Sequence, residues 1–414
     1  MSTLVASTGT VARSFGNFSA QIELGSGTTV NRDMSLASMP TITQDFDLQE
    51  EVADINELKI NLSDITIKIF DGLSEGESLF NYIQALALSD TIQVQITTPA
   101  GTDYFISNKA SCRYDWRSRT VEMTGQAALR FDVEVTGYSI TNKVSGNGWV
   151  APYDVIQKFL STQGSSPTVK VVGSYFDFYD VSSLGTNPVD PPKYIVLPST
   201  AVTTYAQAKT VFLRLSVIEG AMIGTMMGYA FYVRRNFVDE TNTDHFASIS
   251  GSNLKNFGVE FNQRSVRLVE YDFRFEDQTG QPTYTFSDTI NSAGAQDLDI
   301  AYIAAGYKTV EYNDTSNTWV EVDVTADSAL EIGSPTGIAT IGSNTKNSYH
   351  NALGIESSYK VDFEIFGITT LKPYQFIKFG TDIHPTVNGK KIRPSYLEYD
   401  LQNDVVKGEG YIIG

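Results

Sequence analysis

The stretch AQAKTVFLRLSVIEGAMIGTMMGYAFYVRRNF, Ala206 to Phe237, decides the fold because its periodicity changes at a run of glycines. Its first half predicts an amphipathic helix around 206–220, with apolar residues at helical spacing and charged residues between them: Ala208, Val211, Phe212, Leu215 and Ile218. Its second half is rich in Tyr, Phe and Val and predicts a β-strand. The glycines therefore predict an exit from helix to strand, near Gly220 or Gly224.

Glycines four residues apart also occur where transmembrane helices touch, so the spacing alone leaves a membrane helix open. A spanning helix needs about 20 largely apolar residues. Here the uncharged run extends only from Gly220 to Val233, between Glu219 and Arg234. We therefore expect no stable membrane insertion. Packing glycines in a longer buried helix remain an alternative to the helix-to-strand exit. The amino-terminal residues also lack the basic start and apolar core of a secretory signal.

Composition favours a mainly β fold with a minor α+β part. The 414 residues include 22 Tyr, 23 Phe and 32 Gly, which suit strands and tight turns. The formal net charge of -18 keeps the chain soluble and argues against binding to nucleic acid of specific sequence. A single cysteine, Cys112, excludes an intrachain disulfide and a zinc site made of several thiolates.

Changes of pattern divide the chain into four predicted parts. Residues 1–145 read as successive strands, interrupted by one short helix candidate in 78–90, and predict a tube-like β-barrel domain. Residues 146–250 predict an α+β domain that contains the helix around 206–220. Residues 251–355 predict a β domain with insertions, and 356–414 a closing β-barrel segment.

No motif for chemistry stands out. The three histidines, His245, His350 and His384, stand apart from one another, and phosphate-loop, dinucleotide and nucleophile-elbow patterns are missing. Three arginines near Cys112 could lower the pKa of its thiol, although a half-buried strand cysteine is the commoner case. Acidic pairs, Asp297 with Asp299 and Asp239 with Glu240, arise by chance in a chain with 48 acids. We predict no catalytic residues, metal site or cofactor.

Three segments in order resemble the central hub proteins of phage tails and baseplates, which are similar in fold to the hub part of type VI secretion spikes. The first is the helix, glycine exit and strand of 206–237. The second is SNLKNFGVEFNQRSVRLVEYDFRFED. In the family a strand begins here around an N-x-V sequence, and Arg264, Ser265 and Val266 stand in that place. The third is FEIFGITTLKPYQFIKFG and the hairpin that follows, with Leu371 and Pro373 before a strand.

The resemblance implies several β-barrel-like domains in a tail-hub arrangement and a structural role without enzymatic activity. It implies a homotrimer that joins the tail tube to the central spike or tip and forms part of the DNA ejection channel. The implied partners are tube and spike proteins, with the tape-measure protein as a further one. The implied location is the virion tail, after assembly in the host cytoplasm. As interface residues we predict the aromatic and proline side chains of the closing segment and the proline-rich loop: Tyr374, Phe376, Tyr396, Tyr399, Pro191, Pro192 and Tyr194.

Alternatives remain open from the sequence. A distal tail or tube protein shares the barrel pattern, and the helical part from 150 to 235 favours the hub. A receptor- or carbohydrate-binding virion protein would use the many tyrosines as stacking faces. A glycan-cleaving enzyme would need two facing carboxylates, for which the sequence nominates no pair.

Overall fold

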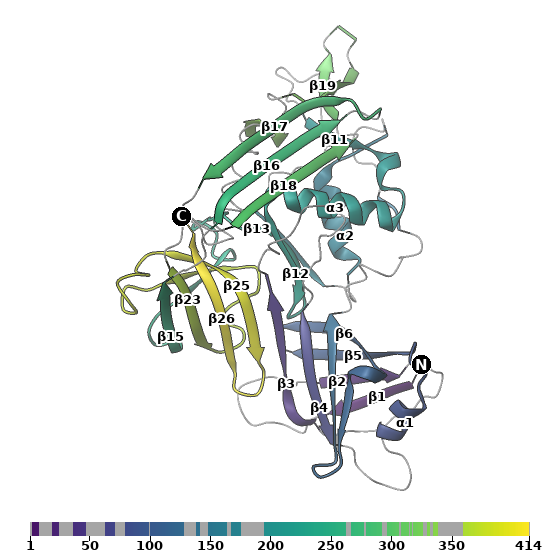
Figure 1. Ribbon diagram of the computed structural model, residues 1–414, viewed down its shortest axis with the longest axis vertical. Helices are drawn as coiled ribbons and strands as arrows, with labels where there is room; N and C mark the ends of the chain where they lie inside the picture. Colours follow the sequence, from purple (N-terminus) through teal and green to yellow (C-terminus); the bar gives the residue numbers. More distant parts are fainter. Residues whose placement is uncertain are drawn as a thin grey trace.

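The computed structural model describes residues 2–7, 19–24, 36–46, 63–70, 79–98, 100–127, 138–140, 148–163, 167–174, 194–261, 266–276, 279–291, 296–305, 308–313, 315–316, 318–325, 329–331, 334–337 and 359–413. The described chain is mainly β, which confirms the predicted fold class, and its helices gather in one central layer and at one flank (Figure 1). The statements below concern these residues.

The largest sheet joins strands from both ends of the chain. Its main path runs β1-β2-β5-β6-β8-β4-β3-β25-β26-β23-β15, and its ends, β1 and β15, are open rather than closed into a barrel. The first-part strands are β1 (Ser2–Ser7), β2 (Ser19–Leu24), β3 (Leu36–Asp45), β4 (Asp64–Phe70), β5 (Thr91–Thr98), β6 (Gly101–Asn108), β7 (Cys112–Asp115) and β8 (Thr120–Ala127). The other strands are β14 (Phe246–Ile249), β15 (Leu254–Phe261), β23 (Tyr359–Phe366), β24 (Phe376–Phe379), β25 (Lys391–Asp400) and β26 (Val405–Ile413).

The step between β3 and β25 makes this one sheet. The two strands are antiparallel, with Tyr396 opposite Asp45 and Asp400 opposite Thr41. The predicted first part, 1–145, and closing segment, 356–414, therefore share a hydrogen-bonded sheet. In β4 the odd residues Ile65, Ile67 and Ile69 are buried while their neighbours are more exposed, so one side of the sheet packs and the other meets solvent.

A central layer of helices and a small sheet lies at the end of the first-part strands, where Ser63 and Asp103 contact its β12–β13 hairpin (Figure 1). It contains α2 (Pro152–Ser161), α3 (Tyr205–Glu219) and the sheet β10-β13-β12, with β10 (Thr168–Val172), β12 (Ala221–Met226) and β13 (Tyr229–Arg234). The five apolar residues predicted to line α3 are all buried, which confirms the helical spacing. Aromatic stacking of Phe159 on both Tyr205 and Phe212 fixes α2 against α3.

The glycine run works as the predicted exit, with one difference. The helix ends at Glu219, and Gly220 takes a left-handed φ of 56°, so the exit is Gly220. Gly224 lies inside β12, a strand that the sequence did not predict. The chain then reverses at Met227 and Gly228, whose φ values of 55° and 77° are those of a two-residue hairpin turn.

The remaining elements lie above the central layer in Figure 1 or at its edges. A three-stranded sheet has the order β17-β16-β18, from β16 (Val266–Glu276), β17 (Pro282–Asn291) and β18 (Gln296–Ala305). A four-stranded sheet has the order β20-β19-β11-β9, from β9 (Trp149–Val150), β11 (Tyr194–Pro198), β19 (Lys308–Asn313) and β20 (Thr318–Asp323). The pair β21 (Ala329–Glu331) and β22 (Ser334–Gly337) completes the strands.

The short helix predicted within 78–90 is α1 (Leu79–Ala85), which ends earlier than expected. Its Leu79 and Ile83 are buried against the first-part strands. Two short 3-10 helices link neighbouring elements among the described residues, one of three residues at Lys109–Ser111 and one of four residues at Ser199–Val202. Within the described ranges, no helix is both long and apolar enough to cross a membrane.

Candidate functional site

The junction between the central layer and the C-terminal strands contains a buried arginine and a cluster of charged side chains. At its centre Arg393, on β25, is 5% exposed. Its guanidinium donates hydrogen bonds to three backbone carbonyl oxygens, those of Arg235 (3.0 Å), Tyr374 (3.3 Å) and Phe237 (2.7 Å). Burial, and then the charge of Arg235, lower the pKa of Arg393 to about 9. One side chain thus ties the segment after β13 to β25.

A second polar cluster lies beside it, around Asp244. Asp244 Oδ1 accepts hydrogen bonds from Lys372 Nζ at 2.6 Å and Tyr374 Oη at 2.9 Å, and Oδ2 accepts one from Lys170 Nζ at 2.6 Å. Burial raises the pKa of this carboxyl, but the three hydrogen bonds outweigh burial and hold the pKa below its usual range. Gln375 Nε2 donates to the Asp244 carbonyl oxygen at 3.1 Å. The Asp244 carboxylate therefore joins three segments: strand β10, the 236–245 loop and residues 372–375.

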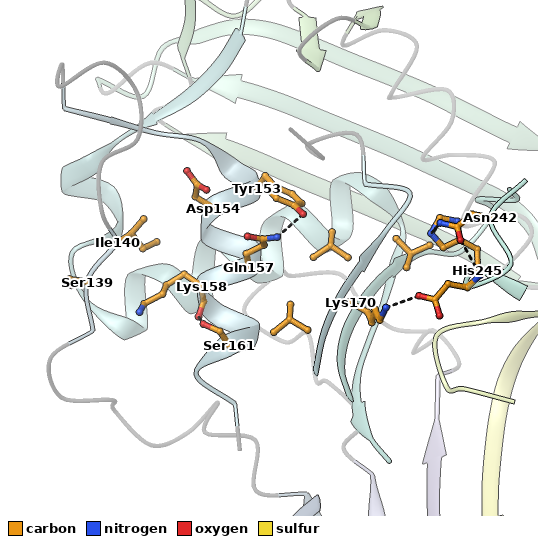
Figure 2. A pocket seen from close by; sticks show the side chains of 14 residues that line it. Ser139, Ile140, Tyr153, Asp154, Gln157, Lys158, Ser161, Lys170, Asn242 and His245 are labelled. Carbon is orange, nitrogen blue, oxygen red and sulfur yellow. Dashed lines mark hydrogen bonds and ion pairs between the residues drawn. The ribbon is translucent and has the colours of Figure 1, made fainter. Parts of the chain in front are cut away.

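A groove of about 610 Å³ opens next to Asp244, between α2 and strand β10. Figure 2 shows Tyr153, Gln157 and Lys158 on one side of the groove, on α2, and Lys170 and His245 on the opposite side. The Tyr153 hydroxyl accepts a hydrogen bond from Gln157 Nε2 at 2.7 Å. Side chains of both charges and several amides and hydroxyls line the groove. It can hydrogen-bond a polar ligand, and among its described lining residues no nucleophile has an aligned base.

The β12–β13 hairpin is held against the first-part sheet by Asp103. The Gly228 N–H donates to Asp103 Oδ1 at 2.8 Å, and Gly228 approaches Gly101 so closely that a Cβ on Gly228 would lie 2.6 Å from Gly101 Cα. Ser63 Oγ donates to the Thr225 carbonyl oxygen at 2.7 Å. Burial raises the pKa of Asp103 to about 6, against the effect of the Gly228 and Met227 N–H groups. The hairpin turn therefore rests on a buried carboxyl.

This carboxyl predicts a pH dependence of stability. Because the folded-state pKa of Asp103 is raised from 3.8 to about 6, its proton binding favours the folded chain most below pH 4. That contribution is lost as the pH rises from about 4 to 6, and amounts to about 3 kcal/mol for a shift of this size. We expect Asp103→Asn to flatten the fall in unfolding free energy between pH 4 and 7, measured by urea denaturation. An unchanged pH profile in the variant would contradict this assignment.

Three of the seven predicted interface residues lie inside the chain. Tyr374, Phe376 and Tyr399 are at most 1% exposed. Their partners are internal: Tyr374 donates to Asp244, Phe376 stacks on Phe246, and the Tyr399 hydroxyl donates to the Leu371 carbonyl oxygen at 2.6 Å. Side chains buried within one chain offer no surface to a partner. Contact of these three residues with a partner chain stays a prediction. The structure shows that their side chains are part of the core of this chain.

The other members of the set differ. Tyr396 is half-buried on the solvent-facing side of β25, and its hydroxyl donates to Glu398 Oε2 at 3.2 Å. Tyr194 begins β11, where it pairs with Val310 of β19. Pro191 and Pro192 lie outside the described residues. Tyr396 is thus the one member of the set for which the structure describes a side chain that reaches solvent.

The isolated histidines and acids form no metal site among the described residues, where no group of three or more potential ligands is found. His245 Nδ1 lies 3.1 Å from Asp239 Oδ2, and Glu240 pairs with Lys378 and Lys391. His384 Nδ1 accepts the Thr386 N–H, and His350 lies outside the described residues. Burial raises the pKa of Cys112 to about 11, so the nearby arginines do not activate its thiol.

Sequence reasoning missed the residues that hold the central layer to its neighbours: Asp103 at the first-part sheet, and Lys170, Asp244 and Arg393 at the junction with the C-terminal strands. A signal exists for Arg393, because in the strand KIRPSYLEYD it has the same alternation as Leu397 and Tyr399, which are buried. A charged residue at a buried strand position needs internal partners. For Asp103, Lys170 and Asp244 the partners lie more than 70 residues away, so local pattern carries no signal.

Neither a protein-family model nor a curated protein matches the sequence. Solved structures do match. A tail protein from Neisseria meningitidis has a TM-score of 0.43 and 10% identity, over 95% of this chain and 96% of that one. A 43 kDa tail protein of a Shewanella oneidensis prophage has a TM-score of 0.41 and 12% identity, over 95% and 98%. An Escherichia coli component of the type VI secretion system has a TM-score of 0.37 and 9% identity, over 95% and 76%. They are proteins of phage tails and of the type VI secretion system, the two assemblies from which the sequence resemblance was drawn.

Proposed function

We propose that this chain is a structural hub or adaptor of a phage tail or baseplate, which joins the tail tube to the central spike or tip and forms part of the channel. One observation carries the proposal: strands from the two ends of the chain share a single sheet through β3 and β25. Among the described strands, both ends of that sheet, β1 and β15, have a neighbour on one side only.

A sheet of this kind suits assembly by broad contact. Open strand edges and a solvent-facing side favour further pairing and packing with other chains. Arg393 and Asp244 join the C-terminal strands to the central layer. The open strand edges are therefore carried by parts of the chain that are tied together, and the proposed role is contact with other chains without turnover of a substrate.

The segments that carry the resemblance support the same proposal. The first forms the expected helix, glycine exit and strand, and the third forms β23, β24 and the antiparallel pair of β25 and β26. The formal charge of -18 suits a ring through which nucleic acid passes without sticking. Tail-tube and spike proteins are the proposed partners, in the virion tail after assembly in the host cytoplasm.

We expect the purified chain to assemble into a ring of three copies, about three times the chain mass of 45.5 kDa. Mass photometry over a concentration series measures the mass, and negative-stain imaging shows whether the particle has a central opening. Binding to both tube and spike proteins would separate a hub from a distal tail protein, which would bind the tube alone.

The contrary outcome is a chain that stays monomeric at high concentration and binds no tail component. Such a chain with a hit on a glycan array would favour the receptor-binding alternative, with the groove beside α2 as its site. Heat-denatured chain serves as the negative control for both binding measurements.

A further inference from the structure

We propose that the tip of the β7–β8 hairpin, with Trp116 as its anchor, docks on the solvent-facing side of the C-terminal strands of a second copy of this chain. The hairpin tip is residues 109–119, and the acceptor surface is the solvent-facing side of β15, β23, β26 and β25 with the end of β3. This inference rests on the proposed function, because it names the contact that would close the ring.

The hairpin tip presents apolar surface that the rest of the chain does not cover. Trp116 is 71% exposed, and Arg117 places its guanidinium over the indole ring, 5.6 Å from its centroid. Phe70 is 46% exposed and lies at the same end of the sheet, because it pairs with Thr120 at the start of β8. Exposed Trp beside Arg is the pair of residue types most enriched at the energetic centres of protein interfaces.

The tip is also held in shape before any partner binds. Asp115 Oδ1 accepts hydrogen bonds from the Arg117 N–H at 2.9 Å and the Ser118 N–H at 3.5 Å. Ser118 Oγ and Thr120 Oγ1 are hydrogen-bonded at 2.8 Å across the base of the turn. A pre-organised turn loses little conformational entropy on docking, so more of the contact energy appears as affinity.

The charge of the tip is opposite to that of the chain. Within residues 109–119 four side chains are basic, Lys109, Arg113, Arg117 and Arg119, and only Asp115 is acidic, whereas the whole chain carries -18. The arginines are exposed, so their field reaches solvent. A second copy of the chain is therefore an electrostatically complementary partner.

The acceptor surface carries the matching charge. Its register rows place six carboxylates and two lysines on one side of the sheet: Asp45, Glu260, Asp362, Glu364, Glu398 and Glu409, with Lys360 and Lys407. A third lysine, Lys255 at the bulge of β15, pairs with Glu364. The lysines pair with Glu364, Glu409 and Glu398, which leaves an excess of negative charge. Burial, and then the charges of Glu398, Glu409 and Asp45, raise the pKa of Tyr396 to about 12. Its half-buried ring offers the indole an aromatic neighbour.

The two surfaces lie on different parts of the large sheet, as a head-to-tail contact requires. The hairpin pairs with β8 on the first-part flank of the large sheet, and β26, β23 and β15 form the opposite flank. When one copy follows another, the first-part flank of one meets the C-terminal flank of the next. Such a heterologous contact generates a closed ring when the rotation between copies closes.

Charge reversal tests the contact. We expect Arg117→Glu combined with Arg119→Glu to weaken assembly at least tenfold, read from mass photometry as the concentration at which half the chains are assembled. Glu260→Lys combined with Asp362→Lys should weaken it similarly. The chain that carries all four substitutions should regain assembly, since the charges attract again. Trp116→Ala should weaken assembly at least tenfold at any salt concentration.

The control is Lys390→Glu, which reverses a charge at an exposed site in the turn before β25, outside both proposed surfaces, and should assemble like the wild type. Circular dichroism checks that each variant is folded. If the wild type forms the ring and the tip variants form it equally well, the inference fails while the proposed function stands. If the wild type forms no ring, both fail. Binding of the tip to vesicles containing 30% phosphatidylglycerol, with ring formation unchanged by Trp116→Ala, would instead assign the tip to a lipid surface.

Discussion

Arg393→Ala is expected to lower the free energy of unfolding by about 3 kcal/mol or more, because it leaves buried carbonyl oxygens without their donor. The guanidinium of Arg393 serves the carbonyl oxygens of Arg235, Tyr374 and Phe237 at once. Its aliphatic stem also leaves a void between β25 and the segment after β13, since Arg393 is 5% exposed. Urea denaturation of the wild type and the variant at pH 7 measures the difference.

A matched substitution separates this effect from a general loss of positive charge. Lys390→Ala removes a cation three residues earlier, at an exposed position, and should change the unfolding free energy by no more than about 0.5 kcal/mol. Arg393→Lys should recover only part of the loss, because an ammonium cannot serve three diverging acceptors with the geometry of a guanidinium. Equal effects at positions 390 and 393 would show that the carbonyl contacts contribute nothing.

Gly228→Ala is expected to destabilise the chain by about 3 kcal/mol. Gly228 has a φ of 77°, and a Cβ there would lie 2.6 Å from the Gly101 Cα, which is backbone and cannot turn away. The turn and the first-part sheet would have to separate, which would also lengthen the hydrogen bond from the Gly228 N–H to Asp103. Thermal and urea unfolding report the loss.

Gly389 provides the comparison for this substitution. Its φ of 68° is similarly left-handed, but no atom lies within 4 Å of the place where a Cβ would stand. Gly389→Ala therefore measures the cost of the backbone conformation alone, about 1 kcal/mol. The excess cost at position 228 is the cost of the close approach to Gly101. If both variants lose the same stability, the approach carries no strain.

The elements that the sequence predicted are those whose signal is local. The α3 helix repeats an apolar residue every three or four positions, and β5 alternates over Thr91–Thr98, so both appear within the predicted stretches. Burial of Ala208, Phe212 and Leu215 follows from spacing alone. The mainly β class follows from composition in the same way.

The features that escaped prediction depend on partners far away in the chain. Strand β12 contains Gly224 and two methionines, which gave it no strand signal, and it forms because β13 pairs along its whole length. Aromatic residues were predicted as interface because they favour both cores and contacts, and burial of Tyr374 and Tyr399 follows only from packing. The clusters around Asp103 and Asp244 combine residues whose separation in sequence hides their meeting.

The pairing of β3 with β25 sets the order in which the chain can be completed during synthesis. Strand β3 ends at Asp45, whereas its partner Tyr396 follows only after about 350 further residues. At a ribosomal rate of about 5–20 residues per second, this delay is roughly 20 to 70 seconds. Throughout that time one edge of β3 lacks its final neighbour, and an unpaired edge invites pairing between nascent chains.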